Sequence, residues 1–475
     1  MIIGRQAEQE QLRTCFNSDR SEFIVVYGRR RVGKTYLVYE TLADKLFFHY
    51  TGTTKIKTTA DNLERFADAL DQFGMHVSET PASWMKAFDL LRDHIKASSN
   101  KQKKVIFIDE MPWLDLPKSG FLAALEYFWN AFAALRKDVL LIACGSSSSW
   151  ISKKILRDQG GLHNRITARI HLQPLTLGEC EDYLEAKHAS LSRYDLIECY
   201  MVFGGIPYYL DYLDGRFSLS TNIDRIIFAE DAALHDEFNE LFASLFKNSD
   251  DYIRIIRALG VKSKGLTRNE IIKTSGLSNG GILSEMLENL ELSGFIRSYY
   301  GYPMKTNGML YQLIDSFSLF YCSFCHPARP TNRHFWSNLA NTPKLNSWRG
   351  YAFEIVCLWH IDQIEQALGI WGVNTRVSSW RSRSVKPGAQ IDLIIDREDR
   401  AINLCEIKYL RDDFEITGKY EAELRNKITV FEKEHKTKKT IFLTLISPYG
   451  IKHNKYSGIV RSQVVMDDLF ASTRK

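Results

Sequence analysis

The sequence has few cysteines and no long apolar run, and both absences narrow the class of protein. Its eight cysteines are scattered through 475 residues. A chain of this length needs no disulfides, so the pattern indicates reduced thiols in the cytoplasm. No stretch approaches the roughly 20 apolar residues that span a bilayer, and the first residues lack the basic and apolar regions of a secretory signal. We therefore expect a cytoplasmic protein with no membrane partner.

A large excess of one charge is also missing. The chain has 62 Lys+Arg against 57 Asp+Glu, a net charge of +5. Composition therefore permits nucleic acid as a partner without requiring it, and any basic surface must be local. Hydrophobic residues make up 45% of the chain, which excludes a disordered protein. A length of 475 residues exceeds one hydrophobic core and suggests about three domains.

One cysteine pair has the spacing of a haem-attachment motif. "CSFCH", Cys322 to His326, lies within the apolar and aromatic stretch "SLFYCSFCHP". Haem attachment belongs to exported proteins, and a zinc site would need a second ligand pair at a suitable spacing. We therefore predict that these are ordinary buried cysteines.

The strongest motif is a phosphate-binding loop near the N-terminus. "FIVVYGRRRVGKTYLVYE" is an apolar strand, then Gly28-x-x-x-x-Gly33-Lys34-Thr35, then a helical pattern. In this context the loop's backbone N–H groups and the helix N-terminus surround phosphates. Lys34 would reach the β- and γ-phosphates and Thr35 would ligate Mg²⁺. Since such a loop acts through its backbone, we expect the intervening arginines to be solvated, with phosphate or DNA contact as the alternative; these are Arg29, Arg30 and Arg31.

Two further strands are predicted to end in polar residues that complete this site. "KKVIFIDEM" ends in Asp109, which can hold Mg²⁺, and Glu110, which can polarise a water towards the γ-phosphate. "DVLLIACGSS" ends at Ser146, whose hydroxyl could sense the γ-phosphate. Apolar strands between helical segments predict a parallel sheet with helices on both faces.

With these motifs the first half of the chain, about residues 1–240, resembles AAA+-type ATPases of the archaeal ATPase family, close to the signal-transduction NTPases. The resemblance rests on Gly4, Arg5 and Glu8 before the first strand, a Walker A motif at Gly28–Thr35 and a Walker B motif at Asp109 and Glu110. It implies ATP and Mg²⁺ as cofactors. The nucleotide contacts that it implies are Gly4, Arg5, Gly28, Val32, Gly33, Lys34, Thr35, Tyr36, Ser146 and Pro207, the last in a helical lid with Gly205-Ile206-Pro207 near the base. Arg165 would be the arginine finger, with Arg169 as the alternative.

The middle of the chain resembles a winged helix-turn-helix. Three helical patterns, in "DYIRIIRAL", "LTRNEIIKTSG" and "SNGGILSEMLENLELSG", precede an alternating segment that turns at "TNG". Ile282, Leu283, Met286, Leu287 and Leu290 are predicted to form the core stripe of the third helix. Its acidic C-terminal half argues against phosphate contact there, so DNA contact and protein contact both stay open. The residues that could form a basic face are Lys262, Lys264, Arg268, Lys273, Arg297 and Lys305.

The last quarter holds a predicted hairpin with charged residues inside it. "AQIDLIID" and "AINLCEIKYL" are separated by the turn "REDR". Pairing about this turn brings Asp392 within a residue of Glu406, and a small bulge would align them. Lys408 shares the face of Glu406. Carboxylates this close repel one another, and a divalent cation would cancel their charge.

This group resembles the PD-(D/E)xK nuclease superfamily. Asp392 and Glu406-x-Lys408 would be the core, and Glu354, on the helix in "SWRGYAFEIVCLWHI", would be the acid on the preceding helix. Ile391 stands where a proline would be ideal. The resemblance implies a metal site at Glu354, Asp392 and Glu406 with Lys408 as a catalytic residue. The alternatives are a degraded nuclease domain and a solvated Glu-x-Lys ladder.

A basic strip precedes Asp392. "WRSRSVKPGAQ" carries Arg381, Arg383 and Lys386, and Trp380 among them could stack on a base. The alternative is a flexible charged loop.

Together these patterns predict an α/β protein: a P-loop NTPase parallel sheet with a helical lid, a winged helix-turn-helix and a C-terminal α/β restriction-endonuclease-like domain. The predicted domains span 1–172, 173–245, 246–325 and 326–475. The expected function is Mg²⁺-dependent ATP hydrolysis on or with DNA, coupled to a metal-dependent nuclease-like domain. The alternative is a slow nucleotide-governed switch whose C-terminal domain only binds nucleic acid or a protein. A second copy of the chain or another protein is a further candidate partner.

Overall fold

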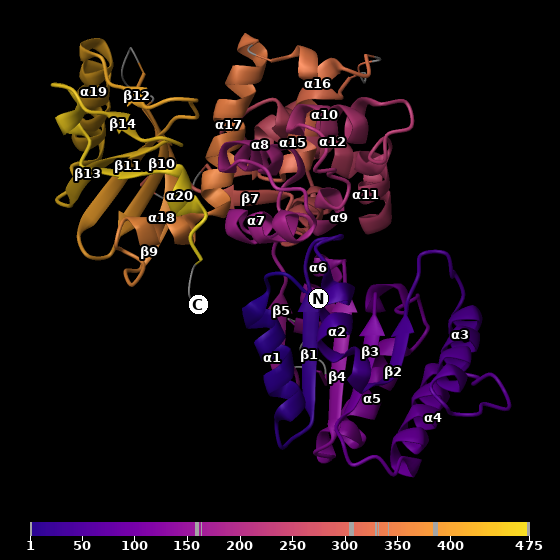
Figure 1. Cartoon of the computed structure of the whole chain (residues 1–475). Coiled ribbons are helices and arrows are strands. Elements are labelled where there is room, and N and C mark those ends of the chain that lie inside the picture. Colours follow the sequence, from indigo (N-terminus) through magenta and orange to yellow (C-terminus); the bar gives the residue numbers. More distant parts are fainter. Residues whose placement is uncertain are drawn as a thin grey trace. The chain divides into compact units, whose positions relative to one another are not determined.

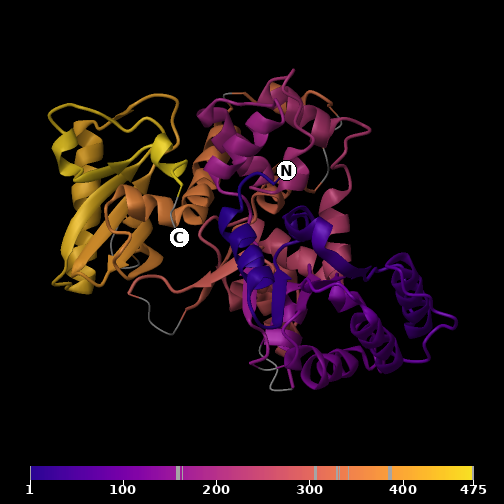
Figure 2. The same cartoon turned by 60° about the horizontal axis from the view of Figure 1, so that its bottom comes forward.

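The computed structural model describes residues 2–156, 161–162, 164–303, 308–327, 330, 332–340, 342–382 and 388–472. It divides into two compact units. The first comprises Met1–Pro174 and Ala243–Lys247, and the second comprises Leu175–Phe242 and Asn248–Lys475. The chain runs from indigo to yellow in Figures 1 and 2.

The first unit is built on a five-stranded parallel sheet in the order β2-β3-β4-β1-β5 (Figure 1). This confirms the predicted parallel α/β fold. Because every strand runs in the same direction, the carboxyl ends of β1, β3 and β4 meet at one edge of the sheet. The strands are β1 Glu22–Tyr27, β2 Leu46–Thr51, β3 Lys104–Asp109, β4 Val139–Gly145 and β5 Ala168–His171.

Helices cover both faces of this sheet. Phe23 and Val25 of β1 belong to one buried cluster with α3, α4 and α5. Ile24 and Val26 are also buried but alternate to the opposite face, where α1 and α2 pack together. The helices of this unit are α1 Gln6–Asn17, α2 Lys34–Leu42, α3 Thr59–Gln72, α4 Trp84–Ala97, α5 Phe121–Ala131 and α6 Ser148–Ile151.

The second unit begins with a group of helices. Thr176 and Glu179 form a reciprocal capping box at the start of α7, which satisfies two backbone donors of that helix. A buried pair, Arg349 Nη2 to Glu198 Oε1 and Oε2 at 2.8 Å each, ties α8 to α17. The helices up to the middle of the chain are α7 Leu177–Ala186, α8 Arg193–Phe203, α9 Pro207–Leu210, α10 Leu219–Ile223 and α11 Glu237–Leu245.

Three helices and a small sheet follow, in the order expected from the sequence. α13 starts at the predicted cap Thr267, whose side chain accepts from Glu270 N, and stops at Gly276 with φ 68°. Strands β7 and β8 pair antiparallel, with β6 on the outer side of β8. The elements are α12 Ser249–Gly260, β6 Leu266–Thr267, α13 Arg268–Ser275, α14 Gly281–Leu292, β7 Ile296–Tyr299 and β8 Leu310–Leu313.

One core prediction for α14 is wrong. The side chains of Leu283, Met286, Leu287 and Leu290 are buried, but Ile282 is 75% exposed. The helix begins at Gly281, three residues after the predicted start, so Ile282 lies in its solvated first turn. The predicted "TNG" turn and Lys305 fall at least partly outside the described residues.

The C-terminal part contains a second sheet in the order β15-β13-β11-β10-β9. β9, β10 and β11 are antiparallel neighbours, whereas β11, β13 and β15 are parallel. In Figure 1 these strands lie among the orange to yellow elements. The strands are β9 Thr375–Arg381, β10 Gln390–Arg397, β11 Ala401–Ile407, β12 Phe414–Glu415, β13 Thr440–Ile446, β14 Ile451–Lys452 and β15 Ser462–Val464.

Helix α19 packs on one face of this sheet, and α17 contacts β11. Ile391 and Ile394 both belong to the cluster with α19. Strict alternation would separate these two residues, but a register shift between them on the β9 side changes the phase. The remaining helices are α15 Ser316–Phe324, α16 Phe335–Asn338, α17 Pro343–Trp359, α18 Ile361–Ala367, α19 Gly418–His435 and α20 Met466–Leu469.

All eight cysteines are free thiols, as expected from their scatter, and only Cys322 is more than slightly exposed. Within the ranges that the structure describes, no helix combines the length and the apolar character needed to cross a membrane.

Candidate functional site

The phosphate loop connects the end of β1 to the start of α2. Gly28 has φ 150° and a Cβ built there would lie 2.3 Å from the Leu172 carbonyl oxygen. Gly33 has φ 93° just before the helix. Both glycines therefore allow a backbone path that other residues resist. Val32 is buried within the loop, whereas Thr35 and Tyr36 are exposed at the first turn of α2.

Lys34 folds over this loop. Its side chain is buried, and its Nζ donates to the carbonyl oxygens of Gly28 at 3.1 Å and Arg29 at 2.9 Å. The ammonium therefore lies among the backbone groups that the motif uses to surround phosphates. A bound triphosphate would offer it stronger, charge-assisted partners than two neutral carbonyls.

The two candidate magnesium ligands of this site are in direct contact. The Thr35 hydroxyl donates to Asp109 Oδ2 at 2.6 Å. Asp109 is the last residue of β3 and is buried, and its Oδ1 accepts from Glu110 N at 2.8 Å. A hydroxyl and a carboxylate are oxygen ligands that Mg²⁺ accepts.

Glu110 and Ser146 are held together at the ends of β3 and β4. The Ser146 hydroxyl donates to Glu110 Oε1, and Ser146 N donates to Glu110 Oε2 at 3.2 Å. Glu110 itself has φ 46°, a conformation that costs a non-glycine residue free energy. Strain and hydrogen bonds together fix the direction of this carboxylate.

Gly4 and Arg5 lie beside the residues that follow β5. Arg5 is buried with φ 60°, and its guanidinium donates to the Gln173 carbonyl oxygen. Gln9 Nε2 donates to the Gly4 carbonyl oxygen at 2.9 Å. Since β5 pairs with β1, this segment lies near the strand that leads into the phosphate loop.

The predicted arginines differ in their exposure to solvent. Arg29 is buried, so the expected solvation of this residue is wrong. Arg165 and Arg169 are both exposed, and Arg165 precedes β5 as expected. Pro207 begins α9 in the second unit, and its contact with the nucleotide stays a prediction.

The C-terminal acidic residues converge as their register requires. Leu393 pairs with Cys405, so continuing the register places Asp392 opposite Glu406, as predicted. The bulge lies between β10 and β9, so the prediction of a bulge in the β10–β11 pair is wrong. Glu354, Asp392, Glu406 and Lys408 line one cavity of about 800 Å³.

Three nearby side chains contact Glu406. Lys408 Nζ lies 2.9 Å from Glu406 Oε1, Lys427 Nζ lies 2.7 Å from Oε2, and the Tyr420 hydroxyl donates to Oε1 at 2.6 Å. Burial opposes ionisation of this carboxylate, but Lys408 and Lys427 keep its pKa below the usual value.

Glu354 and Asp392 instead share an unpredicted partner, Lys264. Lys264 Nζ contacts Glu354 Oε2 and lies 3.1 Å from Asp392 Oδ1. The sequence allowed this lysine a place on a basic face, but in the structure its ammonium group is turned inward onto two carboxylates. No local pattern signals this contact, because 90 residues separate Lys264 from Glu354.

Burial raises the pKa of Glu354 to about 7, with Lys264 opposing the shift and Asp392 adding to it. Within the described ranges no group of three or more His, Cys, Asp and Glu residues is arranged to hold a metal ion. In this structure the carboxylates of Glu354 and Asp392 share one ammonium group, that of Lys264. The carboxylate of Glu406 is paired with other lysines.

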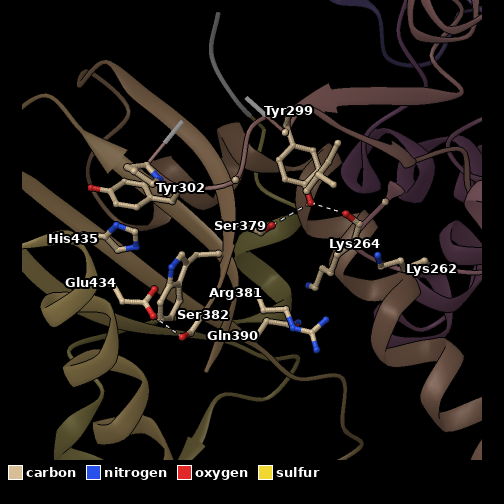
Figure 3. Close-up of a pocket in the computed structure, with 16 residues that line it drawn as sticks. Lys262, Lys264, Tyr299, Tyr302, Ser379, Arg381, Ser382, Gln390, Glu434 and His435 are labelled. Atoms are coloured by element: carbon tan, nitrogen blue, oxygen red, sulfur yellow. Dashed lines mark hydrogen bonds between the residues drawn. The ribbon is translucent and has the colours of Figure 1, made fainter. Parts of the chain in front are cut away.

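A second cavity, of about 810 Å³, adjoins this group (Figure 3). Its lining includes Lys262, Lys264, Arg381 and Gln390, and the last of these also lines the acidic cavity. Trp380 is only 4% exposed and packs edge-on against Phe431, so the prediction that it could stack on a base is wrong. Arg381 remains exposed, while Arg383 and Lys386 fall outside the described residues.

Other predicted basic residues of the middle region have internal partners. Lys262 lies 2.8 Å from Glu270 Oε1, and Arg268 donates to Asn279 and to the Gly280 carbonyl oxygen. Arg297 donates to Gln312 Oε1 at 2.7 Å. The exposed positive charge of this region is therefore smaller than its composition suggests.

Comparison with known proteins identifies an ATPase domain in the N-terminal part of the chain. Residues 3–213 match the model of an ATPase domain predominantly from Archaea. An uncharacterized protein of Methanocaldococcus jannaschii is 24% identical over 413 residues, which are 86% of this chain and 88% of that protein. An uncharacterized ATP-binding protein of the same organism is 42% identical over 45 residues, 10% of this chain and 76% of that protein.

Among solved structures, a Walker-type ATPase of Pyrococcus abyssi has a similar fold. Its TM-score is 0.52 with 17% sequence identity, covering 68% of this chain and 96% of that one. At this identity the likeness concerns the fold alone. The family match, the strand order and the assembled phosphate loop agree, and the N-terminal half of this chain therefore contains an ATPase domain of the family found predominantly in Archaea.

Proposed function

We propose that the chain is a Mg²⁺-dependent ATPase that acts on or with DNA and carries a metal-dependent nuclease-like domain. The proposed division is an ATPase core at 1–172, a helical lid at 173–245, a winged helix-turn-helix at 246–325 and a nuclease-like domain at 326–475. The helix and strand order from α12 to β8 supports the winged helix.

The ATPase proposal depends above all on the contacts Thr35–Asp109 and Glu110–Ser146 at one edge of the parallel sheet. Lys34 would contact the β- and γ-phosphates, and Glu110 would orient and polarise the attacking water. Thr35 and Asp109 would hold Mg²⁺, which supplies positive charge at the phosphates. Gly28, Val32, Gly33 and Tyr36 complete the proposed nucleotide contacts, with Ser146 as the residue that senses the γ-phosphate.

The remaining assignments of this half are what the resemblance to the archaeal ATPase family implies. Gly4 and Arg5 are proposed to lie near the adenine and Pro207 to contribute from the lid. Arg165 is proposed as the arginine finger. Its exposure is compatible with reaching a phosphate in the same chain or in a second copy.

The nuclease-like proposal is carried by the convergence of Glu354, Asp392, Glu406 and Lys408 on one cavity. Mg²⁺ takes one or two carboxylates together with waters and a substrate phosphate. The ammonium group shared by Glu354 and Asp392 supports the proposal that this pair would accept a cation, and Glu406 lines the same cavity. The ion would supply charge at the scissile phosphate, and Lys408 would position the water or stabilise negative charge.

The test is a cleavage and ATPase matrix with plasmid and single-stranded DNA, with Mg²⁺ or Mn²⁺, with and without ATP. We expect wild type to cut DNA and Asp392→Ala to lose cutting while its ATPase activity is retained. Equal cutting by the two proteins would remove the nuclease assignment. Lys34→Ala should lose ATP affinity, and normal ATP binding by that variant would refute the phosphate-loop role.

One observation favours the alternative, a nucleotide-governed switch whose C-terminal domain only binds. Each of the three acidic residues already has a lysine partner in this structure. Under this alternative the purified protein holds its nucleotide tightly and hydrolyses it far more slowly than once per minute. Such a switch works because the bound nucleotide shifts the populations of two conformations, and it needs no repeated hydrolysis. Steady hydrolysis stimulated by DNA would exclude it.

A further inference from the structure

Lys264 reaches the nuclease-like site from a different domain. It lies in the short connection between α12 and β6, and its ammonium group contacts Glu354 of α17 and Asp392 of β10. The two carboxylates belong to elements that are adjacent only in the folded chain. One monovalent cation thus bridges the two acidic residues that are proposed to hold a divalent one.

The backbone of this connection is fixed so that the lysine is presented to the acids. The Tyr299 hydroxyl donates to the Lys264 carbonyl oxygen at 2.8 Å and lies 3.1 Å from Ser379 Oγ of β9 (Figure 3). Gln312 Nε2 donates to the Ser263 carbonyl oxygen at 2.8 Å. Gly265 has φ 80°, and a Cβ there would lie 2.3 Å from the Tyr311 carbonyl oxygen. The loop is therefore anchored on the strands β7, β8 and β9.

The charges explain why this arrangement is stable and also why it excludes a metal. Two carboxylates brought together repel one another, and a cation between them removes the repulsion. Lys264 Nζ contacts both carboxylates at once, so its ammonium group occupies the position between them. A divalent ion on the same oxygens would lie against that ammonium, so the two cations compete for one place.

We propose that Lys264 is a built-in competitor of the divalent cation, so that the winged-helix loop closes the nuclease-like site until Lys264 leaves. This inference depends on the proposed metal site and adds its regulation. The lysine stem is flexible, and the side chains of Lys264, Glu354 and Asp392 are 20%, 19% and 13% exposed. The contact is therefore open enough to water to be exchanged for a hydrated metal ion.

The direct test is Mn²⁺ binding to the full-length, nucleotide-free protein, measured by calorimetry and by the electron paramagnetic resonance signal of free Mn²⁺. We expect Lys264→Met to bind Mn²⁺ on the order of tenfold more tightly than wild type, because apparent affinity scales with the open fraction of the site. Lys262→Met is the matched control. It removes the same charge from the same loop, but Lys262 is paired with Glu270 and not with Glu354 or Asp392. The double variant Lys264→Met/Asp392→Asn should lose the gain.

The outcomes separate this inference from the proposed function. If wild type and Lys264→Met bind Mn²⁺ with equal affinity, and this binding requires Asp392, then Lys264 is not a competitor but the metal site is supported. If neither protein binds Mn²⁺ in a way that requires Asp392, both the proposed metal site and the competitor role of Lys264 are wrong. Circular dichroism establishes that each variant is folded.

A second measurement uses wild type alone and decides the matter if Lys264→Met does not fold. Lysines are acetylated with an N-hydroxysuccinimide ester with and without Mn²⁺, and modification is quantified by mass spectrometry. If Mn²⁺ displaces Lys264, the rate of acetylation of Lys264 should rise several-fold, whereas the rate of acetylation of Lys262 should stay unchanged. An unchanged rate at Lys264 would overturn the inference.

Discussion

The Thr35 hydroxyl and the Asp109 carboxylate are 2.6 Å apart although 74 residues separate them in sequence. The contact joins the first turn of α2 to the end of β3, and it brings both oxygen ligands to the place where the phosphate loop ends. A divalent ion bound with nucleotide would accept both oxygens and thereby replace their mutual hydrogen bond.

Removal of the Thr35 hydroxyl should make nucleotide binding insensitive to magnesium. We expect Mg²⁺ to strengthen ATP binding by wild type, and Thr35→Ala to lose most of that gain while metal-free binding is retained. Titration of a fluorescent ATP analogue with and without Mg²⁺ measures the difference. Thr54→Ala, an exposed turn residue, is the control. A full magnesium effect in Thr35→Ala would contradict the assignment.

Substitution of Glu110 should separate binding from hydrolysis. Glu110→Gln keeps the size of the side chain and its contact with Ser146 but removes the base, so kcat should fall by about 10²- to 10⁴-fold with little change in ATP affinity. Steady-state phosphate release and equilibrium binding give the two quantities. Glu64→Gln, on the exposed side of α3, should behave as wild type, and unaltered turnover in Glu110→Gln would exclude the proposed role.

Arg381 should contribute to affinity for single-stranded DNA. It is exposed at the end of β9 and lines the cavity beside Asp392. If it contacts a phosphate, Arg381→Ala should weaken binding and lower the slope of log affinity against log salt by about 1. Fluorescence anisotropy over a salt series measures both. Arg425→Ala, which removes an exposed arginine paired with Glu421 on α19, should leave the slope unchanged, and equal slopes in all three proteins would refute the contact.

His360 should make the second unit sensitive to acid. It is fully buried, Nδ1 donates to the Val356 carbonyl oxygen at 2.7 Å and Nε2 accepts from Leu177 N at 2.9 Å. Burial lowers its pKa from 6.5 to about 4. The unfolded chain therefore binds the proton first, and the stabilisation present above pH 6.5 is lost as pH falls towards 4, up to about 3 kcal/mol.

Urea unfolding at several pH values measures this loss. His360→Gln should be less stable than wild type near pH 7.5 but show a shallower decline between pH 6.5 and 4. His76→Gln, at an exposed position, should keep the wild-type slope. Parallel pH curves for wild type and His360→Gln would show that another group is responsible.

Local patterns predicted what depends on local backbone chemistry. The phosphate loop, the Thr267 cap and the β10–β11 hairpin all follow from a few adjacent residues, and the structure has each of them where the sequence indicates, without the predicted bulge in the hairpin. Trp380 and Arg29 were misjudged because their burial is decided by α19 and by the loop's own fold, which no neighbouring residue reveals. Lys264 was misjudged for the same reason, since its carboxylate partners come from two distant elements.

The close approach of Gly28 to the Leu172 carbonyl has a mechanical consequence. No side chain intervenes between the first residue of the phosphate loop and the backbone two residues before Pro174, where the first unit ends. Any side chain at position 28 would clash with that peptide, so the loop and the segment that leaves β5 stay in direct backbone contact. Gly28→Ala would therefore disturb the path of the chain at residue 172 as well as the phosphate loop itself.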